Sequence, residues 1–143
     1  MTLQSIYDTI KDYAMNTKGV ESFTVSDPYV CWNAKNMTYG AFNVYLNYIQ
    51  CEDNANYRLY NFTFYFGDKL TNNSSNLYEV QDEGVKVIEN VIRHLREDFY
   101  YNEDYNVQIR LFTQAFADIL AGAYADVNII IPIDDQCENY DKE

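Results

Sequence analysis

The first regular pattern along the chain is helical. Apolar side chains recur every three or four residues at Leu3, Ile6, Tyr7, Ile10, Tyr13 and Ala14. This is the spacing of one face of an α-helix, and Gly19 stands where such a helix would end. Charged residues occupy the opposite face, so we expect an amphipathic helix over residues 3–17 that covers one side of a sheet.

Patterns typical of strands follow this helix. Residues 21–25 form a short β-branched and aromatic run, whereas residues 28–40 show no clear period. Alternation then extends over residues 41–50 and 57–66, and the second run places Tyr60, Phe62, Phe64 and Phe66 on one face. The intervening residues 51–56, rich in Asp and Asn, suit the connection of an antiparallel hairpin. We therefore expect one short strand and two long ones.

The longest predicted element is a second helix over residues 77–98. A polar loop, residues 71–76, supplies N-cap residues before it. Its continuous apolar stripe, which we expect to pack on the sheet, consists of Ile88, Val91, Ile92 and Leu95.

The remainder of the chain predicts two further strands. Residues 100–106 are polar and turn-forming, after which residues 107–112 alternate in the manner of a strand. The Ala-rich residues 114–122 are ambiguous, and the β-branched residues 124–131 predict the last strand.

The order α-β-β-β-α-β-β predicts an α+β protein with a mostly antiparallel sheet and two main helices. With 143 residues and 48% hydrophobic content, the chain has enough apolar surface for one core, so we expect a single domain over residues 1–133. Residues 134–143 hold five acids and one lysine without apolar periodicity. Such a composition is typical of a tail that is flexible or is ordered by a partner.

Net charge and hydropathy disfavour two classes of protein, those that grip nucleic acids and those that cross a membrane with a helix. Twenty-two acidic residues against ten basic ones give a formal charge of −12, which argues against a role in gripping nucleic-acid phosphates. The most apolar stretch, residues 112–132, contains Asp118 and Asp126, so we expect no membrane-spanning helix. The N-terminus has no signal-peptide pattern, and we expect synthesis and folding in the cytoplasm.

Residues that could carry chemistry do not form a recognisable catalytic pattern. His94 is the one histidine, and the three cysteines, Cys31, Cys51 and Cys137, are widely spaced without a CxxC motif. Acidic pairs such as Glu52/Asp53 lack the arrangement of a calcium loop, and the glycines lack the spacing of a phosphate-binding loop. We expect no enzymatic activity, no cofactor and no metal, with His94 at a surface or interface and Cys31 as a buried or half-buried thiol.

The aromatic content indicates assembly. Fifteen tyrosines are present, and the two long predicted strands carry apolar or Tyr side chains on both faces. Such a sheet is expected to be covered by helices on one side and by a neighbour on the other. The alternative is that the monomer covers both faces. The candidate interface residues are Tyr45, Tyr57, Tyr60, Phe62, Phe64, Tyr124, Asp134 and Asp135.

Two segments of the chain resemble segments of known phage proteins. Residues 62–95 (FTFYFGDKLTNNSSNLYEVQDEGVKVIENVIRHL) and residues 107–132 (VQIRLFTQAFADILAGAYADVNIIIP) are similar to small neck or tail proteins of phages infecting Bacteroidetes, including crAss-like phages. The shared features are Asp68-Lys69-Leu70 at a strand end, Ser75-Asn76 in the polar loop, and the run from Phe112 to Val127. The element order resembles that of tail-terminator and head-to-tail joining proteins of tailed phages.

The resemblance covers about the last two-thirds of the chain and implies a structural virion protein. Such proteins form a ring of six or twelve subunits in the phage neck or tail, next to portal, connector or tail proteins, and DNA passes through the ring without specific binding. An acidic lining would repel DNA phosphates and leave the genome free to slide. The alternative interpretation is a small cytosolic acidic adaptor that binds a protein partner without catalysis.

Overall fold

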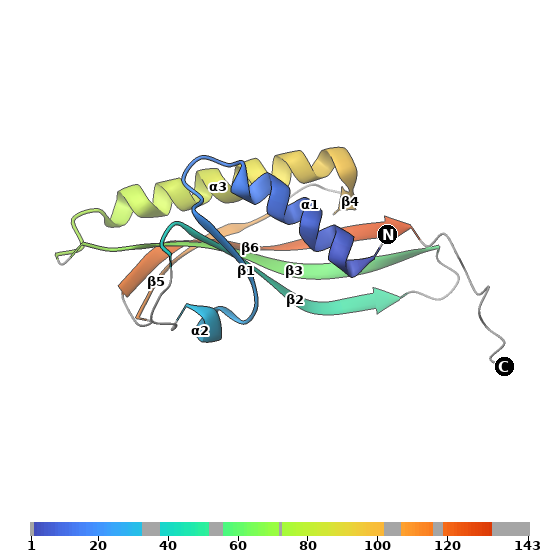
Figure 1. Ribbon diagram of the computed structural model, residues 1–143, viewed down its shortest axis with the longest axis horizontal. Helices are drawn as coiled ribbons and strands as arrows, with labels where there is room; N and C mark the ends of the chain where they lie inside the picture. The colour runs from blue at the N-terminus through green and yellow to red at the C-terminus, as the bar shows by residue number, and fades with distance from the viewer. Residues whose placement is uncertain are drawn as a thin grey trace.

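The computed structural model describes residues 2–32, 38–51, 56–71, 73–101, 107–115 and 119–132. Along the chain its elements are α1 (Leu3–Met15), β1 (Ser22–Val25), α2 (Pro28–Cys31), β2 (Ala41–Cys51), β3 (Tyr57–Lys69), α3 (Leu77–Asp98), β4 (Tyr100–Tyr101), β5 (Ile109–Ala115) and β6 (Ile119–Pro132). All six strands belong to one sheet, with two long helices on one side (Figure 1). The predicted α+β class with a mostly antiparallel sheet is confirmed.

The sheet is built around two long central strands. β3 and β6 pair antiparallel along their whole length, from Tyr57 opposite Pro132 to Lys69 opposite Leu120. β2 pairs antiparallel with β3, as expected for the hairpin, and β1 adds to β2 in parallel. On the far side of β6, β5 pairs with its first half and β4 with its second.

The core lies between the sheet and the helices α1 and α3. Alternate side chains of β3 point into it, and Phe62, Phe64 and Phe66 are fully buried. Ile6 and Ile10 of α1 pack into the same cluster, and the Tyr7 ring meets Phe62 edge to face at 5.9 Å. Burial of these apolar surfaces is the main force that holds the helices on the sheet.

The helix α3 has the bounds predicted from its sequence, and its predicted apolar stripe is confirmed as buried. Ile88, Val91 and Leu95 are fully buried and Ile92 is 4% exposed. Asn76 is the residue that precedes the helix, as the polar loop suggested. Its side chain makes no capping hydrogen bond, because its Oδ1 accepts from the backbone N–H of Thr71 at 2.9 Å instead.

Several element boundaries differ from the prediction, most of all after α3. Tyr100 and Tyr101, expected in a turn, form β4 opposite Ile130 and Ile129, since the chain leaving α3 runs beside the outer edge of β6. Residues 102–106 lie outside the described residues. β5 extends to residue 115, and β6 begins at residue 119, because the Ala-rich segment pairs with β5 and supplies small residues beneath α3.

The stretch without a clear period, residues 28–40, contains the short helix α2. Asp27 caps it by accepting a hydrogen bond from the Tyr29 N–H at 2.9 Å, and Pro28 occupies its first turn, where a missing N–H costs nothing. In Figure 1, α2 lies on the side of the sheet opposite to α1 and α3.

Candidate functional site

The sheet face opposite α1 and α3 is the most distinctive surface of the molecule. We call it the open face, because only α2 covers it among the described elements, and α2 covers one end (Figure 1). Side chains on this face alternate with the buried core positions of β2, β3 and β6. The open face holds exposed and half-buried residues of the long strands, together with the buried Asn43 and Thr63.

A hydrogen-bonded row of polar side chains crosses the open face. We call it the polar ladder, and its members are Asn47, Asn61, Thr63, Asp126 and Asn128. The Asn47 amide donates to the Asn61 side-chain oxygen at 2.8 Å and to the Thr63 hydroxyl at 2.7 Å. Asn61 donates to Asn128 at 2.6 Å, and the Thr63 hydroxyl donates to the Asp126 carboxylate at 2.6 Å. Mutual bonding of this kind presents polar groups in fixed positions.

Next to the polar ladder lies a pocket of about 300 Å³ beneath α2. We call it the aromatic pocket, and it is lined by Pro28, Tyr29, Trp32, Tyr65, Leu111, Phe112 and Tyr124. Trp32 is 2% exposed and forms the floor, whereas Tyr29 and Leu111 are 58% and 53% exposed and form the rim. The pocket therefore has a buried floor and a mouth that opens to solvent.

The rings of the aromatic pocket pack against one another. Trp32 stacks on Phe112 with ring centroids 5.9 Å apart and meets Tyr65 edge to face at 6.0 Å. Tyr65 stacks on Tyr124 at 5.8 Å across the β3–β6 pair. Ring pairs at these separations are mutually stabilising, so the walls of the pocket are pre-formed.

Two features hold α2 over the pocket. Gly67 of β3 leaves room for the indole, because a Cβ at this position would lie 3.0 Å from the Trp32 ring. The buried Asn43 accepts a hydrogen bond from the Thr24 hydroxyl at 2.6 Å and donates to the Ser26 carbonyl at 2.8 Å. These bonds tie β1 and the start of α2 to β2.

The outer edge of β2 is a second accessible feature. β1 pairs only with its first four residues, Ala41 to Val44, and in the described part of the chain no strand continues along Tyr45 to Ile49. Tyr45, Tyr48 and Ile49 are 39%, 49% and 45% exposed. We call residues 45–49 the free edge. It is uncharged and rich in residues that favour strands, which makes it a template for pairing with another strand.

The predicted interface residues fall into three groups. Tyr45 lies at the free edge, Tyr57 is half-buried at the start of β3, and Tyr124 lines the aromatic pocket. Tyr60, Phe62 and Phe64 require a correction, because they are 5%, 0% and 0% exposed beneath the chain's own helices, where a partner does not reach them. Asp134 and Asp135 lie outside the described residues.

Residues that sequence reasoning missed are Trp32, Tyr29 and Tyr65, together with the polar ladder. The sequence feature that could have indicated the pocket is the apolar and aromatic run PYVCW at residues 28–32, which places an indole one turn after a capped proline. The ladder had no signal of its own, because its members come from three strands and only the pairing register brings them together.

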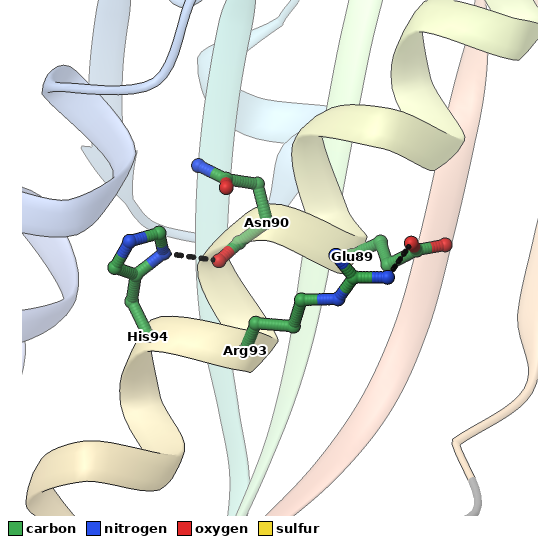
Figure 2. A network of polar contacts seen from close by, with 4 residues as sticks. All are labelled: Glu89, Asn90, Arg93 and His94. Carbon is green, nitrogen blue, oxygen red and sulfur yellow. Dashed lines mark hydrogen bonds and ion pairs between the residues drawn. The ribbon is translucent and has the colours of Figure 1, made fainter.

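His94, expected at a surface or interface, is half-buried on α3 (Figure 2). Its Nδ1 lies 2.8 Å from the backbone carbonyl of Asn90, and its ring lies 5.4 Å from that of Tyr13. Figure 2 also shows the surface ion pair between Arg93 and Glu89, at 2.7 Å. These contacts of the imidazole are those of a residue that joins α3 to α1.

The cysteines and carboxylates of the described residues do not assemble a metal centre. Cys31 is half-buried, as expected, with its sulfur 3.5 Å from the Asn43 side-chain oxygen, and Cys51 is exposed at the end of β2. Cys137 lies outside the described residues. Across the described segments, no group of three or more His, Cys, Asp or Glu side chains is placed to hold a metal ion.

A wider hollow of about 570 Å³ lies between the end of α1 and the first half of α3. It is lined by Thr17, Lys18, Glu79, Asp82, Glu83, Lys86, Val87 and Asn90. Burial raises the pKa of the Glu83 carboxyl, and the carboxylates of Asp68 and Glu79 raise that pKa further. Lys86 pairs with Asp82 at 3.0 Å on the exposed side. The hollow holds charges of both signs.

Comparison with known proteins does not assign the chain to a family. No protein-family model matches the chain, and no curated protein matches its sequence. Among the described residues, no helix is both long enough and apolar enough to cross a membrane. The geometry of the free edge, the polar ladder and the aromatic pocket is therefore the basis for a functional proposal.

Proposed function

We propose that the protein is a structural assembly subunit that joins copies of itself through the edges of its sheet. The observation that carries this proposal is the free edge of β2, with its exposed Tyr45, Tyr48 and Ile49. Proteins that remain monomeric usually protect such an edge with charge, proline or a covering loop. Tyr45 to Ile49 contain no charged residue and no proline.

A second edge on the other side of the sheet supplies a complementary surface. β5 pairs with β6 on one side, and no described strand pairs with its other side. Leu111 on this strand is 53% exposed. A contact between the β2 edge of one copy and the β5 edge of the next is heterologous, and repetition of such a contact closes a ring when the rotation between copies allows it.

The ring that we propose is a virion component of the neck or tail of a tailed phage, with six or twelve subunits around the DNA. This finer proposal rests on the sequence resemblance and is supported by the sheet edges and by the net charge of −12. A channel lined with carboxylates repels DNA phosphates, so DNA passes without being held. Portal, connector or tail proteins would be the neighbours of this ring.

The test is the mass of the purified protein in solution. Light scattering coupled to size exclusion, measured over a range of protein concentrations, should show an oligomer well above the 16.8 kDa of one chain. Replacing Ile49 with Lys places a charge on the free edge and should shift the population towards the monomer. Tyr78→Lys is the matched control, because Tyr78 is 82% exposed on α3 and does not belong to the free edge.

A wild-type chain that stays monomeric at every concentration, together with its absence from purified particles in electron microscopy, would rule out the ring. The second candidate function, an acidic adaptor for a protein partner, would then take its place. That candidate is favoured by a different observation, the aromatic pocket, whose mouth opens beside α2 and not at the free edge.

A further inference from the structure

The aromatic pocket has the walls of a site that recognises a cation. Four of its rings, Trp32, Tyr65, Phe112 and Tyr124, are linked in pairs with centroids 5.8–6.3 Å apart. The faces of such rings carry negative electrostatic potential and attract ammonium or guanidinium groups placed over them. The pre-formed walls lower the ordering cost of binding.

Carboxylates lie around these rings. Asp27 precedes α2 and contacts the backbone of the rim residue Tyr29, and Asp126 is two residues from Tyr124 on the same face of β6. Both aspartates are exposed; neither lines the pocket itself, and Asp126 lines the adjacent small hollow together with Tyr124. Burial raises the pKa of the Tyr65 hydroxyl, and the charges of Asp126 and Asp27 raise it further, which is consistent with negative potential at this position.

Two cations of the chain belong to the same side of the sheet. Arg110 lies opposite Tyr124 in the β5–β6 register and donates to the Gln108 side chain at 3.2 Å. The Lys69 ammonium lies 5.5 Å from the centroid of the Tyr39 ring. Neither residue lines the aromatic pocket, although Arg110 lines the adjacent small hollow with Tyr124 and Asp126.

We propose that the aromatic pocket binds an arginine side chain of a partner protein. The guanidinium would stack within the ring walls while its N–H groups face Asp27 and Asp126. Arginine fits better than lysine because its planar group stacks on aromatic faces and donates to carboxylates from a fixed fork. The acidic charge of the whole chain, −12, favours a basic partner by long-range attraction.

This inference does not require ring assembly, because the pocket and the free edge of β2 are separate surfaces; the β5 edge borders the pocket, since Leu111 belongs to both. The Ile49→Lys variant, designed to weaken assembly, should retain the pocket and its affinity for arginine. Failure of one proposal therefore leaves the other standing.

The experiment uses the one tryptophan of the chain as its reporter, since Trp32 is the floor of the pocket. Full-length protein is titrated with a short capped Gly-Arg-Gly peptide, and tryptophan fluorescence is recorded. The matched probe is the same peptide with citrulline, which keeps the shape of arginine but has no charge. We expect a saturable change with arginine and an affinity about tenfold weaker with citrulline.

Two isosteric variants test the carboxylates. Asp27→Asn retains an N-cap residue for α2, and Asp126→Asn retains an acceptor for the Thr63 hydroxyl, so both preserve the local fold while removing one charge. Each should weaken binding of the arginine peptide several-fold. Arg110→Gln should strengthen it by removing a like charge, and Tyr78→Ala on α3 is the control that should change nothing.

Equal affinity for the arginine and citrulline peptides would overturn the proposal, because the pocket would then respond to shape alone. So would the absence of a saturable change up to about 10 mM arginine peptide. A stronger response to the matching lysine peptide would contradict the choice of arginine.

Discussion

Glu83 is the residue whose environment departs most clearly from that of a solvated surface acid. It lies on α3 facing the turn after α1, so close to Gly19 that a Cβ added there would overlap the Glu83 carboxylate. Burial disfavours its ionised form, and the negative charges of Asp68 and Glu79 act in the same direction. Lys18 and Lys86 only partly offset these effects.

The Glu83→Gln variant is expected to be more stable than the wild type at neutral pH. The pKa of Glu83 is raised in the folded state, so the folded protein binds this proton more tightly than the unfolded chain does. The carboxyl is therefore most favourable to stability at acidic pH, and its contribution is lost as pH rises through the folded-state pKa. Urea unfolding of both proteins between pH 4 and pH 8, a range of about four pH units that spans the titration of a perturbed carboxyl, measures the difference.

The gain in Glu83→Gln should shrink towards the acidic end of this range. Glu97→Gln is the matched control, because Glu97 is exposed in the last turn of the same helix and is not among the charges that shift the pKa of Glu83. A gain that is the same at every pH would show that the amide acts through packing and not through charge.

At the scale of elements, the approach of α3 to β6 depends on the absence of a side chain at Gly84. A Cβ at this position would lie 2.9 Å from the backbone nitrogen of Ala123 and 3.2 Å from the Ala123 Cβ. The small residues at the start of β6, Ala121 and Ala123, are fully buried beneath the helix. The close approach of α3 to β6 therefore requires small residues on both elements, a glycine on the helix and alanines on the strand.

The Gly84→Ala variant should be destabilised by about 1–3 kcal/mol, the usual cost of overpacking a well-filled core. Intrinsic helix propensity predicts the opposite sign, because Ala is favoured over Gly in a helix interior by about 1 kcal/mol. The free energy of unfolding from chemical denaturation separates the two effects. Lys86→Ala, an exposed substitution on the same helix, serves as the control, and a more stable Gly84→Ala protein would mean that α3 sits further from β6 than the structure has it.

The hairpin β2–β3 shows how one element serves two purposes. Its first half is buried beside β1, with Phe42 and Val44 in the core. A register shift between Leu46 and Tyr48 then interrupts the alternation, and the second half becomes the exposed free edge. A bulge of this kind turns a strand away from the regular ladder and commonly marks a sheet edge with a role in binding.

At the scale of the whole molecule, the excess of acidic residues is the dominant electrostatic property. Two side-chain ion pairs of the described segments, Lys86 with Asp82 and Arg93 with Glu89, are both exposed. Exposed pairs of this kind add little to stability. Self-repulsion among 22 acidic groups therefore opposes compaction.

Stability should rise with ionic strength. Salt shortens the screening length from about 10 Å at 0.1 M to about 3 Å at 1 M, which weakens the repulsion between like charges. Thermal unfolding in increasing sodium chloride should show a higher Tm, and the increase should be smaller in a variant with the exposed Glu21 and Glu97 changed to Gln. A Tm that is independent of salt in the wild type would show that the acids are too widely separated to interact.

The sequence alone determined most of the secondary structure and one face of the core. The α3 helix and its stripe of Ile88, Val91, Ile92 and Leu95 followed from periodicity, because burial of one face imposes a period of 3.6 residues on any amphipathic helix. The hairpin followed from alternation with period two. These signals are local, so they are visible without knowledge of what lies opposite.

Only the tertiary structure decided which aromatic residues are accessible. Tyr60, Phe62 and Phe64 appeared equivalent to Tyr45 and Tyr124 as interface candidates, but two helices cover the first group and leave the second within reach of solvent. The aromatic pocket and the polar ladder join residues that are distant in sequence. Strand order and register place the members of the ladder together, and the packing of α2 on the sheet completes the pocket. The alternation of side chains shows only that a strand has two faces. The packing of the whole sheet decides which of these faces the helices cover.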